Sequence, residues 1–339
     1  MALFSRRPKD ASDRPDDTGS VPPVADALAD DATDAVAEDA AASVAISVSS
    51  FRGLGSPDPQ PAEPVVPTAP SPRAVNTAAE TVPGLRDNVL LRETLARMPE
   101  RPTSQDLMDV ARQVLQGHLF LRVKGDARAL IAERKELPLA AVTIGERRFA
   151  AAFSSGAALA ESIRLDGDAD TTAMAQPVLV VLRHALGGSA EGLAIDPASA
   201  PGRAILPRDL IERMVAAADD QLALKTLLTR ERTDGTVAEV AEALARVPLW
   251  AAVNRAEDGA PLGVAEGRAE DGLRFLEVYS HPLEVVAMGR GDQPTPITAT
   301  QLAAALAADE GLSGVTVDPR GPWLRLTRAD LAPVTSLAD

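Results

Sequence analysis

The chain of 339 residues contains no cysteine, only three histidines and only nine aromatic residues. The absence of cysteine excludes disulfides, thiolate nucleophiles and every metal site built on sulfur, and it suits a reducing compartment. No uncharged apolar run approaches the roughly 18 to 20 residues that a membrane-spanning helix needs, and the N-terminus lacks the pattern of a signal peptide. We therefore expect a soluble, cytoplasmic protein.

Basic residues are scarce relative to acidic ones, with 34 Lys and Arg against 49 Asp and Glu and a net charge of -15. Binding to nucleic acid requires clustered Lys and Arg to meet the phosphates, and anionic membranes attract the same kind of cluster. We expect neither a nucleic acid nor a membrane as a partner.

What the sequence does contain is a long repeat, because blocks of the first half return in the second half in the same order. Leu91-Arg92, for example, returns as Leu224-Lys225. Six of the nine aromatic residues fall in matched positions, namely the pairs Phe120/Trp250, Phe149/Phe275 and Phe153/Tyr279. A period this long indicates duplication of a whole domain. We predict two tandem domains, residues 86–215 and 216–339, with these aromatic side chains largely buried in both cores.

Residues 1–85 differ in composition from the rest, with twelve of the chain's 27 prolines and thirteen acidic against six basic residues. So little apolar area cannot offset the backbone entropy of folding, roughly 1 to 2 kcal/mol per residue, and we expect a disordered tail. One apolar segment, residues 44–54, interrupts it. It is open to three interpretations: a sticky patch of the tail, a docking segment, or a phosphate loop around Gly53 and Gly55, which no GK[ST] follows. The docking interpretation assigns the contacts to Ile46, Val48, Phe51 and Leu54.

The second half carries the clearer pattern of secondary structure. Asp-Gly pairs at 258–259 and 271–272 predict tight turns between strands at about 249–255, 261–267 and 273–279. Helices are predicted at about 236–247 and 299–309, with a short one through Val285 and Met288 and a terminal one opened by Thr327 and Asp330. Strands clustered between helices indicate an α+β fold, with two similar domains that each have a mostly antiparallel sheet and flanking helices.

The matched strand endings Phe153-Ser154-Ser155 and Tyr279-Ser280-His281 are followed by Gly-Leu-Ala-Ile-Asp-Pro at 192–197 and Gly-Val-Thr-Val-Asp-Pro at 314–319. In this order the motifs resemble the N-terminal domain of the SseB family, present twice and covering residues 88–336. The family typically has Asn at the two positions where this chain has Asp. It has no settled enzymatic activity, so the resemblance supplies no catalytic residue.

The repeat also tests the residues that could support catalysis. None of the three histidines recurs, since His118 aligns with Pro248, His184 with Leu306 and His281 with Ser155. A site common to both domains therefore cannot depend on histidine. The leucine opposite His184 predicts a partly buried packing role for this histidine.

Serine and acidic residues give no catalytic or metal-binding pattern either. The sequence lacks a Gly-x-Ser-x-Gly turn, and we interpret Ser154 and Ser280 as helix caps. Neither Asp196 nor Asp318 has a second acid or a histidine at metal-binding spacing. We predict no catalytic residue, no metal and no cofactor.

Asp196 and Asp318 are the acids of most interest, because each ends a strand just before a proline. In one interpretation each carboxylate accepts hydrogen bonds from the turn that it begins. In the other, the loops after these strands form the mouth of a ligand or partner site, with Arg208 and Arg328 nearby to bind an anion.

These observations favour a non-enzymatic, cytoplasmic protein that acts through contact with an unidentified protein partner. The alternative is a small-molecule sensor or a cryptic enzyme that uses a cleft between the two repeats. The apolar segment 44–54 favours contact over catalysis, as does the lack of a second polar residue type paired with either aspartate.

Overall fold

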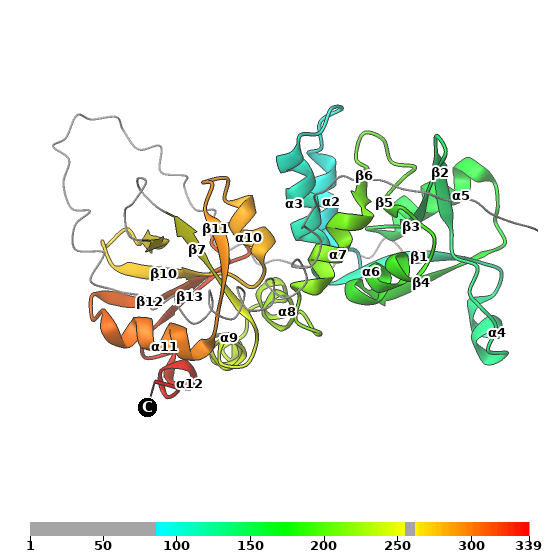
Figure 1. Ribbon diagram of the computed structural model, residues 1–339. Coiled ribbons are helices and arrows are strands. Elements are labelled where there is room, and N and C mark those ends of the chain that lie inside the picture. The colour runs from blue at the N-terminus through cyan, green and yellow to red at the C-terminus, as the bar shows by residue number, and fades with distance from the viewer. Residues whose placement is uncertain (1–85, 255–261, 339) are drawn as a thin grey trace, which may run out of the picture. The chain divides into compact units, whose positions relative to one another are not determined.

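The computed structural model describes residues 86–254 and 262–338, which all belong to one compact unit. The tail, with its apolar segment 44–54, and the Asp-Gly turn at 258–259 lie outside these residues. The fold of the described part is α+β, as the sequence predicts, with eleven helices and four mostly antiparallel sheets (Figure 1).

The first half of the described chain begins with two helices and ends with a β-hairpin and a helix. Its elements are, in order, α2 (Val89–Ala96), α3 (Ser104–Val114), β1 (His118–Lys124), α4 (Ala127–Ala132), β2 (Ala141–Ile144), β3 (Arg147–Ala152), α5 (Gly156–Asp166), β4 (Thr171–Pro177), α6 (Val178–Gly187), β5 (Gly192–Ile195), β6 (Ala204–Pro207) and α7 (Arg208–Ala216).

The second half has the same order of parts, except that no described helix corresponds to α4 and that two short strands occupy the place of β2. Its elements are α8 (Ala223–Thr229), α9 (Thr236–Leu244), β7 (Leu249–Asn254), β8 (Gly263–Val264), β9 (Glu266–Arg268), β10 (Arg274–Val278), α10 (Pro282–Ala287), β11 (Gln293–Ile297), α11 (Ala299–Ala308), β12 (Leu312–Val317), β13 (Leu324–Thr327) and α12 (Ala332–Thr335).

Each half has one four-stranded sheet with the same pattern of strand directions. The strand orders are β2-β3-β5-β6 and β9-β10-β12-β13, in which the outer pairs are antiparallel and the central pairs, β3 with β5 and β10 with β12, are parallel. A parallel pair requires a long crossover connection. In both halves that connection contains a helix, a strand and a second helix.

A smaller sheet lies beside each four-stranded one: β1 with β4 in the first half, and β11-β7-β8 in the second. In each half, one residue between the strands is hydrogen-bonded to both sheets through its backbone. The Ala140 N–H donates to the carbonyl of Arg122, and the Ala140 carbonyl accepts from the N–H of Ala151; Ala265 is placed in the same way between Ala252 and Glu277. The predicted run of strands in the second half is therefore present, but its middle strand is divided between two sheets.

Two apolar layers cover the faces of each four-stranded sheet. In the first half the larger layer combines β5 and β6 with α2, α3, α6 and α7, and includes Leu193, Ile195 and Leu206. The smaller layer packs α5 on the opposite face, against Phe120 and Phe153. The second half repeats this division, with its smaller layer around Tyr279.

The matched aromatic residues mostly lie in these cores, as the sequence predicts. Phe120, Phe153 and Tyr279 are fully buried, and Phe149 and Phe275 are nearly so. Isolated bridges pair Phe120 with Phe153 and Trp250 with Tyr279. Trp250 is only half-buried, so five of the six side chains meet the expectation.

A glycine occupies the same place in two matched hairpins, β5–β6 and β12–β13. Gly192 in β5 and Gly314 in β12 have φ of 153° and 154°, and a Cβ at either position would overlap the carbonyl oxygen of Leu206 or Leu326 on the neighbouring strand. The two strands of each hairpin can approach this closely only because the residue has no side chain.

Two details of the second half differ from the sequence prediction. Strand β11 was not expected, because Pro294 and Pro296 lie within it; it is an edge strand, where alternate N–H groups need no partner. The contact between Thr327 and Asp330 exists, but the terminal helix begins only at Ala332. Among the described residues, no helix is long and apolar enough to cross a membrane.

Candidate functional site

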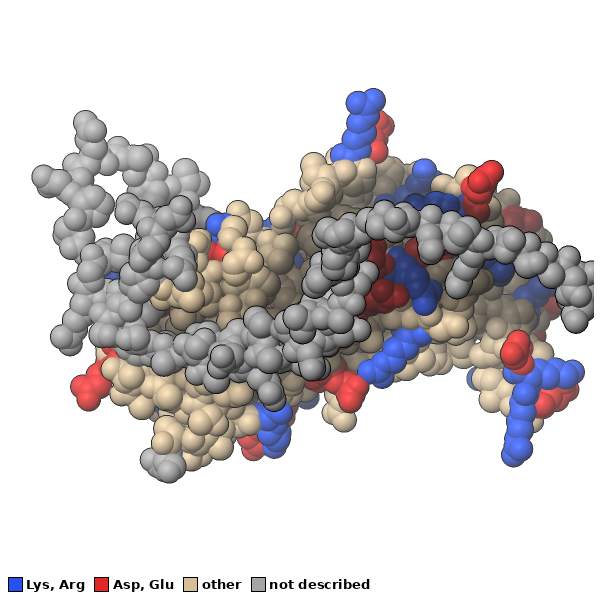
Figure 2. All heavy atoms as spheres, viewed as in Figure 1, with Lys and Arg blue, Asp and Glu red and all other residues tan. Residues whose placement is uncertain are grey.

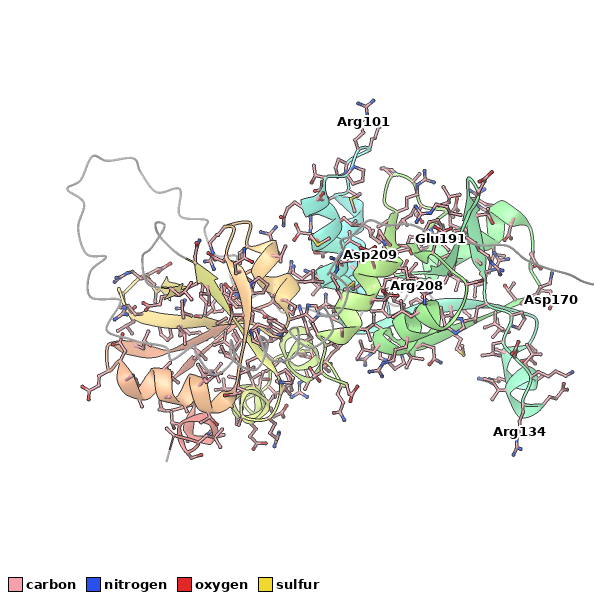
Figure 3. The ribbon with its side chains drawn as sticks, in the orientation of Figure 1. Arg101, Arg134, Asp170, Glu191, Arg208 and Asp209 are labelled. Atoms are coloured by element: carbon pink, nitrogen blue, oxygen red, sulfur yellow. The ribbon has the colours of Figure 1, made fainter. Side chains whose placement is uncertain are left out.

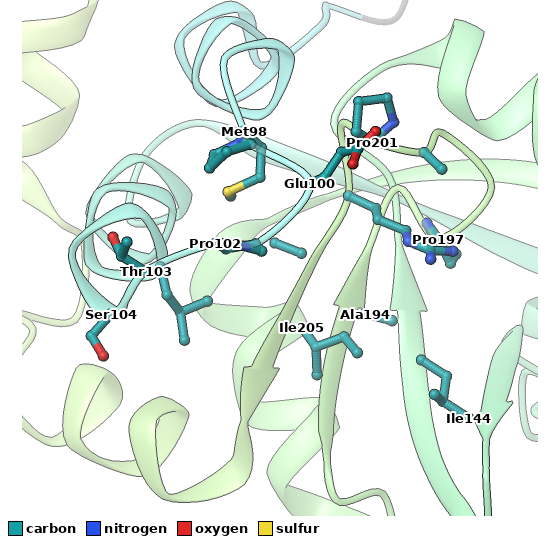
Figure 4. A pocket seen from close by; sticks show the side chains of 15 residues that line it. Met98, Glu100, Pro102, Thr103, Ser104, Ile144, Ala194, Pro197, Pro201 and Ile205 are labelled. Carbon is teal, nitrogen blue, oxygen red and sulfur yellow. The ribbon is translucent and has the colours of Figure 1, made fainter.

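The most distinctive surface of the first half is an open groove of about 810 Å³ on its four-stranded sheet (Figure 4). Ala194, Ile205 and Ile144 form its floor, on the face opposite to the larger core. Its walls come from the connection between α2 and α3, residues 98–107, and from the loop between β5 and β6, residues 197–203. We call this surface the apolar groove.

Strand register explains why apolar side chains gather there. Ala151 of β3 lies beside Ala194 of β5, which lies beside Ile205 of β6, so these three side chains share one face of the sheet. Ala151 and Ala194 are buried, whereas Ile205 is 36% exposed and Ile144 is 47% exposed. Prolines at positions 99, 102, 197 and 201 add apolar surface to the walls. Exposed apolar side chains gathered in one concave patch are typical of a binding surface.

The corresponding face of the second half is polar, and its side chains contact one another. The positions that match Ala151, Ala194 and Ile205 in strand register hold Glu277, Thr316 and Arg325. The Arg325 guanidinium lies 4.6 Å from the ring centre of Phe275 and 5.5 Å from that of Trp323. Glu277 accepts a hydrogen bond from the hydroxyl of Tyr279 at 2.6 Å. The first half has one comparable contact on this face, between the Arg147 guanidinium and the ring of Phe149 at 5.2 Å. At the positions of Ala194 and Ile205, however, only the second half has polar or charged side chains.

The two aspartates of interest form matched contacts with serines. In the first half, the backbone N–H of Ser154 donates to Asp196 at 2.7 Å and its hydroxyl donates to the other carboxylate oxygen. Ser280 makes the same two bonds to Asp318, at 2.8 and 2.6 Å. The helix-cap interpretation of both serines is therefore wrong. Ser155 and His281, one residue further on, cap α5 and α10.

These carboxylates are bound across the sheet, from β3 to β5 and from β10 to β12, and not by the turn that each residue begins. The turns use the backbone carbonyls instead: Ser199 donates to the Asp196 carbonyl and Gly321 to that of Asp318. Both aspartates adopt a left-handed conformation, with φ of 48°. Such a conformation is tolerated by Asp better than by most residues. A structural role for the carboxylates was expected, but with a different donor.

The electrostatic surroundings of the two aspartates differ. Burial raises the pKa of Asp196 to about 6; the hydrogen bonds from Ser154 oppose this shift, and the charge of Asp87 adds to it. Asp87 itself is buried, pairs with Arg92 at 2.8 Å and accepts from the N–H of Gly156. Asp318 instead lies 3.9 Å from the ammonium group of Lys225.

Lys225 belongs to a buried ionic cluster, which we define as Arg112, Lys225, Glu284 and Asp318. Glu284 pairs with Lys225 and, at 3.3 Å, with Arg112, whose guanidinium also donates to the carbonyl of Gly321 at 2.5 Å. The side chains of all four are at most 8% exposed. Burial lowers the pKa of Lys225 to about 8, while Asp318 raises it and Arg112 lowers it further. The cluster connects α3 of the first half to α8 and α10 of the second.

His281 lies beside this cluster and is also buried. Its Nδ1 accepts from the N–H of Leu283 at 3.1 Å, so Nε2 carries the hydrogen and donates to the carbonyl of Met214 at 3.0 Å. Burial lowers the pKa of His281 to about 3; the bond to Met214 raises it, and the charge of Lys225 lowers it. The imidazole is a neutral structural group here. His118 and His184 are exposed, so the expected packing role of His184 is wrong.

Arg208 and Arg328 do not lie near the two aspartates. The N–H of Arg208 donates to Glu191, just before the start of β5, whereas Asp196 follows the end of that strand (Figure 3). The two guanidinium groups bind the ends of the preceding helices, through the carbonyls of Leu186, Gly188 and Ala190 for Arg208 and of Leu306, Asp309 and Leu312 for Arg328. A shared anion site formed by each aspartate and its arginine is therefore not assembled.

Both acidic and basic side chains are scattered over the described part of the face in Figure 2, and several charged side chains form ion pairs. Examples are Arg164 with Glu161 and Arg213 with Asp209. Within residues 86–254 and 262–338, no group of three or more His, Asp or Glu side chains could hold a metal ion. The described surface therefore offers the apolar groove as its best-defined candidate site.

This groove was not predicted from the sequence. Ile46, Val48, Phe51 and Leu54 lie outside the described residues, and their contacts stay a prediction. The sequence contained one signal of the groove. In the repeat Ile205 aligns with Arg325, so that an apolar residue and a charged one occupy matched positions of corresponding strands. Such an exchange at a surface position marks a face that the two domains use differently.

Comparison with known proteins gives one match. Residues 222–332 match the family model of the SseB protein N-terminal domain. No curated protein and no solved structure matches the chain. The resemblance of the first half to the same family stays a prediction from the sequence.

Proposed function

We propose that this protein acts by binding a protein partner, and that the apolar groove receives an extended apolar segment of that partner. The observation that carries the proposal is the difference between matched faces: Ala151, Ala194 and Ile205 in the first half, against Glu277, Thr316 and Arg325 in the second. Where Ile205 is exposed on the floor of a concave patch, the second half has an arginine that stacks on its own aromatic side chains, and the fold alone does not require this difference.

The proposal includes a common origin for the two halves, residues 86–215 and 216–339, as two copies of one domain. The matched order of elements, the matched serine–aspartate contacts and the matched glycines at positions 192 and 314 support it. In this view one copy carries the binding surface. The other copy contributes Lys225 and Glu284 to the ionic cluster that connects them.

The alternative of a small-molecule site between the two halves receives less support. The side chains of the ionic cluster occupy part of that junction and satisfy one another there. The apolar groove has a volume in the range of small-molecule sites, but its floor offers no convergent polar groups, and such groups usually fix the orientation of a small ligand.

The test compares two variants of the full-length protein. Ile205→Arg introduces into the groove the residue that the second half has at this position. The matched control, Val180→Arg, adds the same charge on α6, where Val180 is 47% exposed. A partner recovered from cells and then purified should bind the unchanged protein and the control equally, and bind Ile205→Arg at least tenfold more weakly. Equal affinity for both variants would rule out the groove as the binding surface.

A further inference from the structure

We propose that the apolar groove is also the docking site of a segment of this chain itself, residues 46–54, so that this segment competes with the protein partner. The inference rests on the proposed function, because it assigns a regulator to the same groove. Three features support it: the groove has an exposed apolar floor, the described chain begins beside the groove, and the chain before that point is long enough to reach it.

The chemistry of the segment matches the groove. The tail is rich in acids and prolines, but Ile46, Val48, Phe51 and Leu54 place four apolar side chains within nine residues. The floor of the groove presents Ile144 and Ile205, whose exposed surface such side chains can bury. In an extended chain Ile46 and Val48 project to the same side, which suits a ligand that lies along a sheet face.

The described chain begins beside the groove. Asp87 is the second described residue, and its charge acts on Asp196. The next residue after Asp196 is Pro197, which lines the groove. The tail therefore joins the folded part close to one wall of the groove.

The length of the connection permits the contact. Roughly 30 residues separate Leu54 from Asp87, and a coil of that length has an average reach of about 30 Å. A tether of this kind gives an effective concentration on the order of 1 mM. A segment with an intrinsic Kd of about 0.1 mM would then occupy the groove for about nine-tenths of the time, while a partner of higher affinity could still displace it.

The absence of cysteine allows a direct test in the full-length chain, because introduced cysteines are the only thiols. The test pair is Ser50→Cys with Arg203→Cys on the wall of the groove. The control pair is Ser50→Cys with Arg183→Cys, an exposed position on α6, which packs on the opposite face of the sheet. Under mild oxidation we expect the test pair to form its intramolecular disulfide at least tenfold faster than the control pair.

Two further substitutions show whether the contact is specific. Phe51→Asp in the tail, or Ile144→Asp in the groove, should reduce the rate of the test pair to that of the control pair. Equal rates for the two pairs without these changes would overturn the inference. Disulfides that form between two copies instead of within one would overturn it as well.

The competition has its own measurement, which separates this inference from the proposed function. Phe51→Asp should strengthen binding of the purified partner about tenfold, because the competing segment is lost. If the partner binds through the groove and Phe51→Asp leaves its affinity unchanged, the proposed function stands and this inference fails. If the disulfide forms as expected but no partner depends on Ile205, the docking of residues 46–54 in the groove stands, and the proposed function fails together with the competition.

Discussion

Asp196 is the residue through which the fold of the first half responds to pH near neutrality. Its folded-state pKa of about 6 lies above the value of about 3.9 for an unfolded chain. The protonated carboxyl is therefore favoured by folding. Its contribution to stability is fully present below about pH 4 and is lost as the pH rises through about 6.

We expect Asp196→Asn to raise the free energy of unfolding at pH 7.5 by about 1 to 3 kcal/mol, because a neutral amide removes the cost of burying a charge. At pH 4 the gain should disappear. Chemical denaturation at the two pH values measures this. Asp318→Asn is the matched control: it removes a charge that lies near Lys225, and we expect it to destabilise the protein at pH 7.5. A loss of stability in Asp196→Asn at pH 7.5 would contradict the prediction.

The contribution of His281 to stability changes with pH in the opposite direction. Its folded-state pKa of about 3 lies below the unfolded value of about 6.5, so its contribution is present above pH 6.5 and is lost as the pH falls toward 3. Asn at this position keeps a side chain able to cap α10. When the pH falls from 7.5 to 5, we expect the free energy of unfolding of His281→Asn to decrease by about 2 kcal/mol less than that of the unchanged protein. Thermal and chemical denaturation at both pH values check this, and His118→Asn at an exposed position is the control. Equal losses for the two variants would refute it.

The β5–β6 and β12–β13 hairpins depend on glycine in both halves. We expect Gly192→Ala to lower the free energy of unfolding by at least about 3 kcal/mol, because the new methyl group would overlap the Leu206 carbonyl and separate β5 from β6. Gly167→Ala is the matched control, since Gly167 also has a positive φ but open space around it; about 1 kcal/mol is expected there. Urea denaturation distinguishes the two. Similar losses would mean that backbone conformation, and not the close approach, decides the effect.

Much of the element pattern could be predicted from the sequence. The helical spacing around Val240 and Leu244 and the Asp271-Gly272 turn each produce the expected structure, because they act over a few neighbouring residues. Strand β11 could not be predicted in this way. Its prolines are tolerated only at the edge of a sheet, and which strand lies at the edge is decided by pairing with strands far away in the sequence.

The candidate site was harder to predict for the same reason. Asp196 receives its hydrogen bonds from Ser154, which is 42 residues away, so no local turn rule could identify the donor. The groove depends on which part of a sheet face α5 leaves uncovered, and this is decided by the packing of Leu159 against Phe120 and Phe153.

The two halves are connected through Glu284, which neutralises two buried cations. We expect Glu284→Gln to lower the free energy of unfolding by about 3 to 5 kcal/mol, because it leaves Lys225 and Arg112 without their shared carboxylate. Asp209→Asn, which breaks an exposed pair with Arg213, should cost less than about 1 kcal/mol. Calorimetry of the full-length protein measures both. A double change, Glu284→Met with Lys225→Met, should recover part of the loss, and no recovery would show that the loss does not come from an unpaired charge.

The backbone bonds of Ala140 and Ala265 have a consequence for the way each half opens. Because the N–H of each residue is bonded to one sheet and its carbonyl to the other, the two sheets cannot separate without breaking one of these bonds. We expect amide hydrogens at these seams to exchange with solvent only when the whole half opens. The N–H groups of Ala151 and Glu277, which donate to the carbonyls of Ala140 and Ala265, should therefore exchange as slowly as any in their half, and report on its global unfolding.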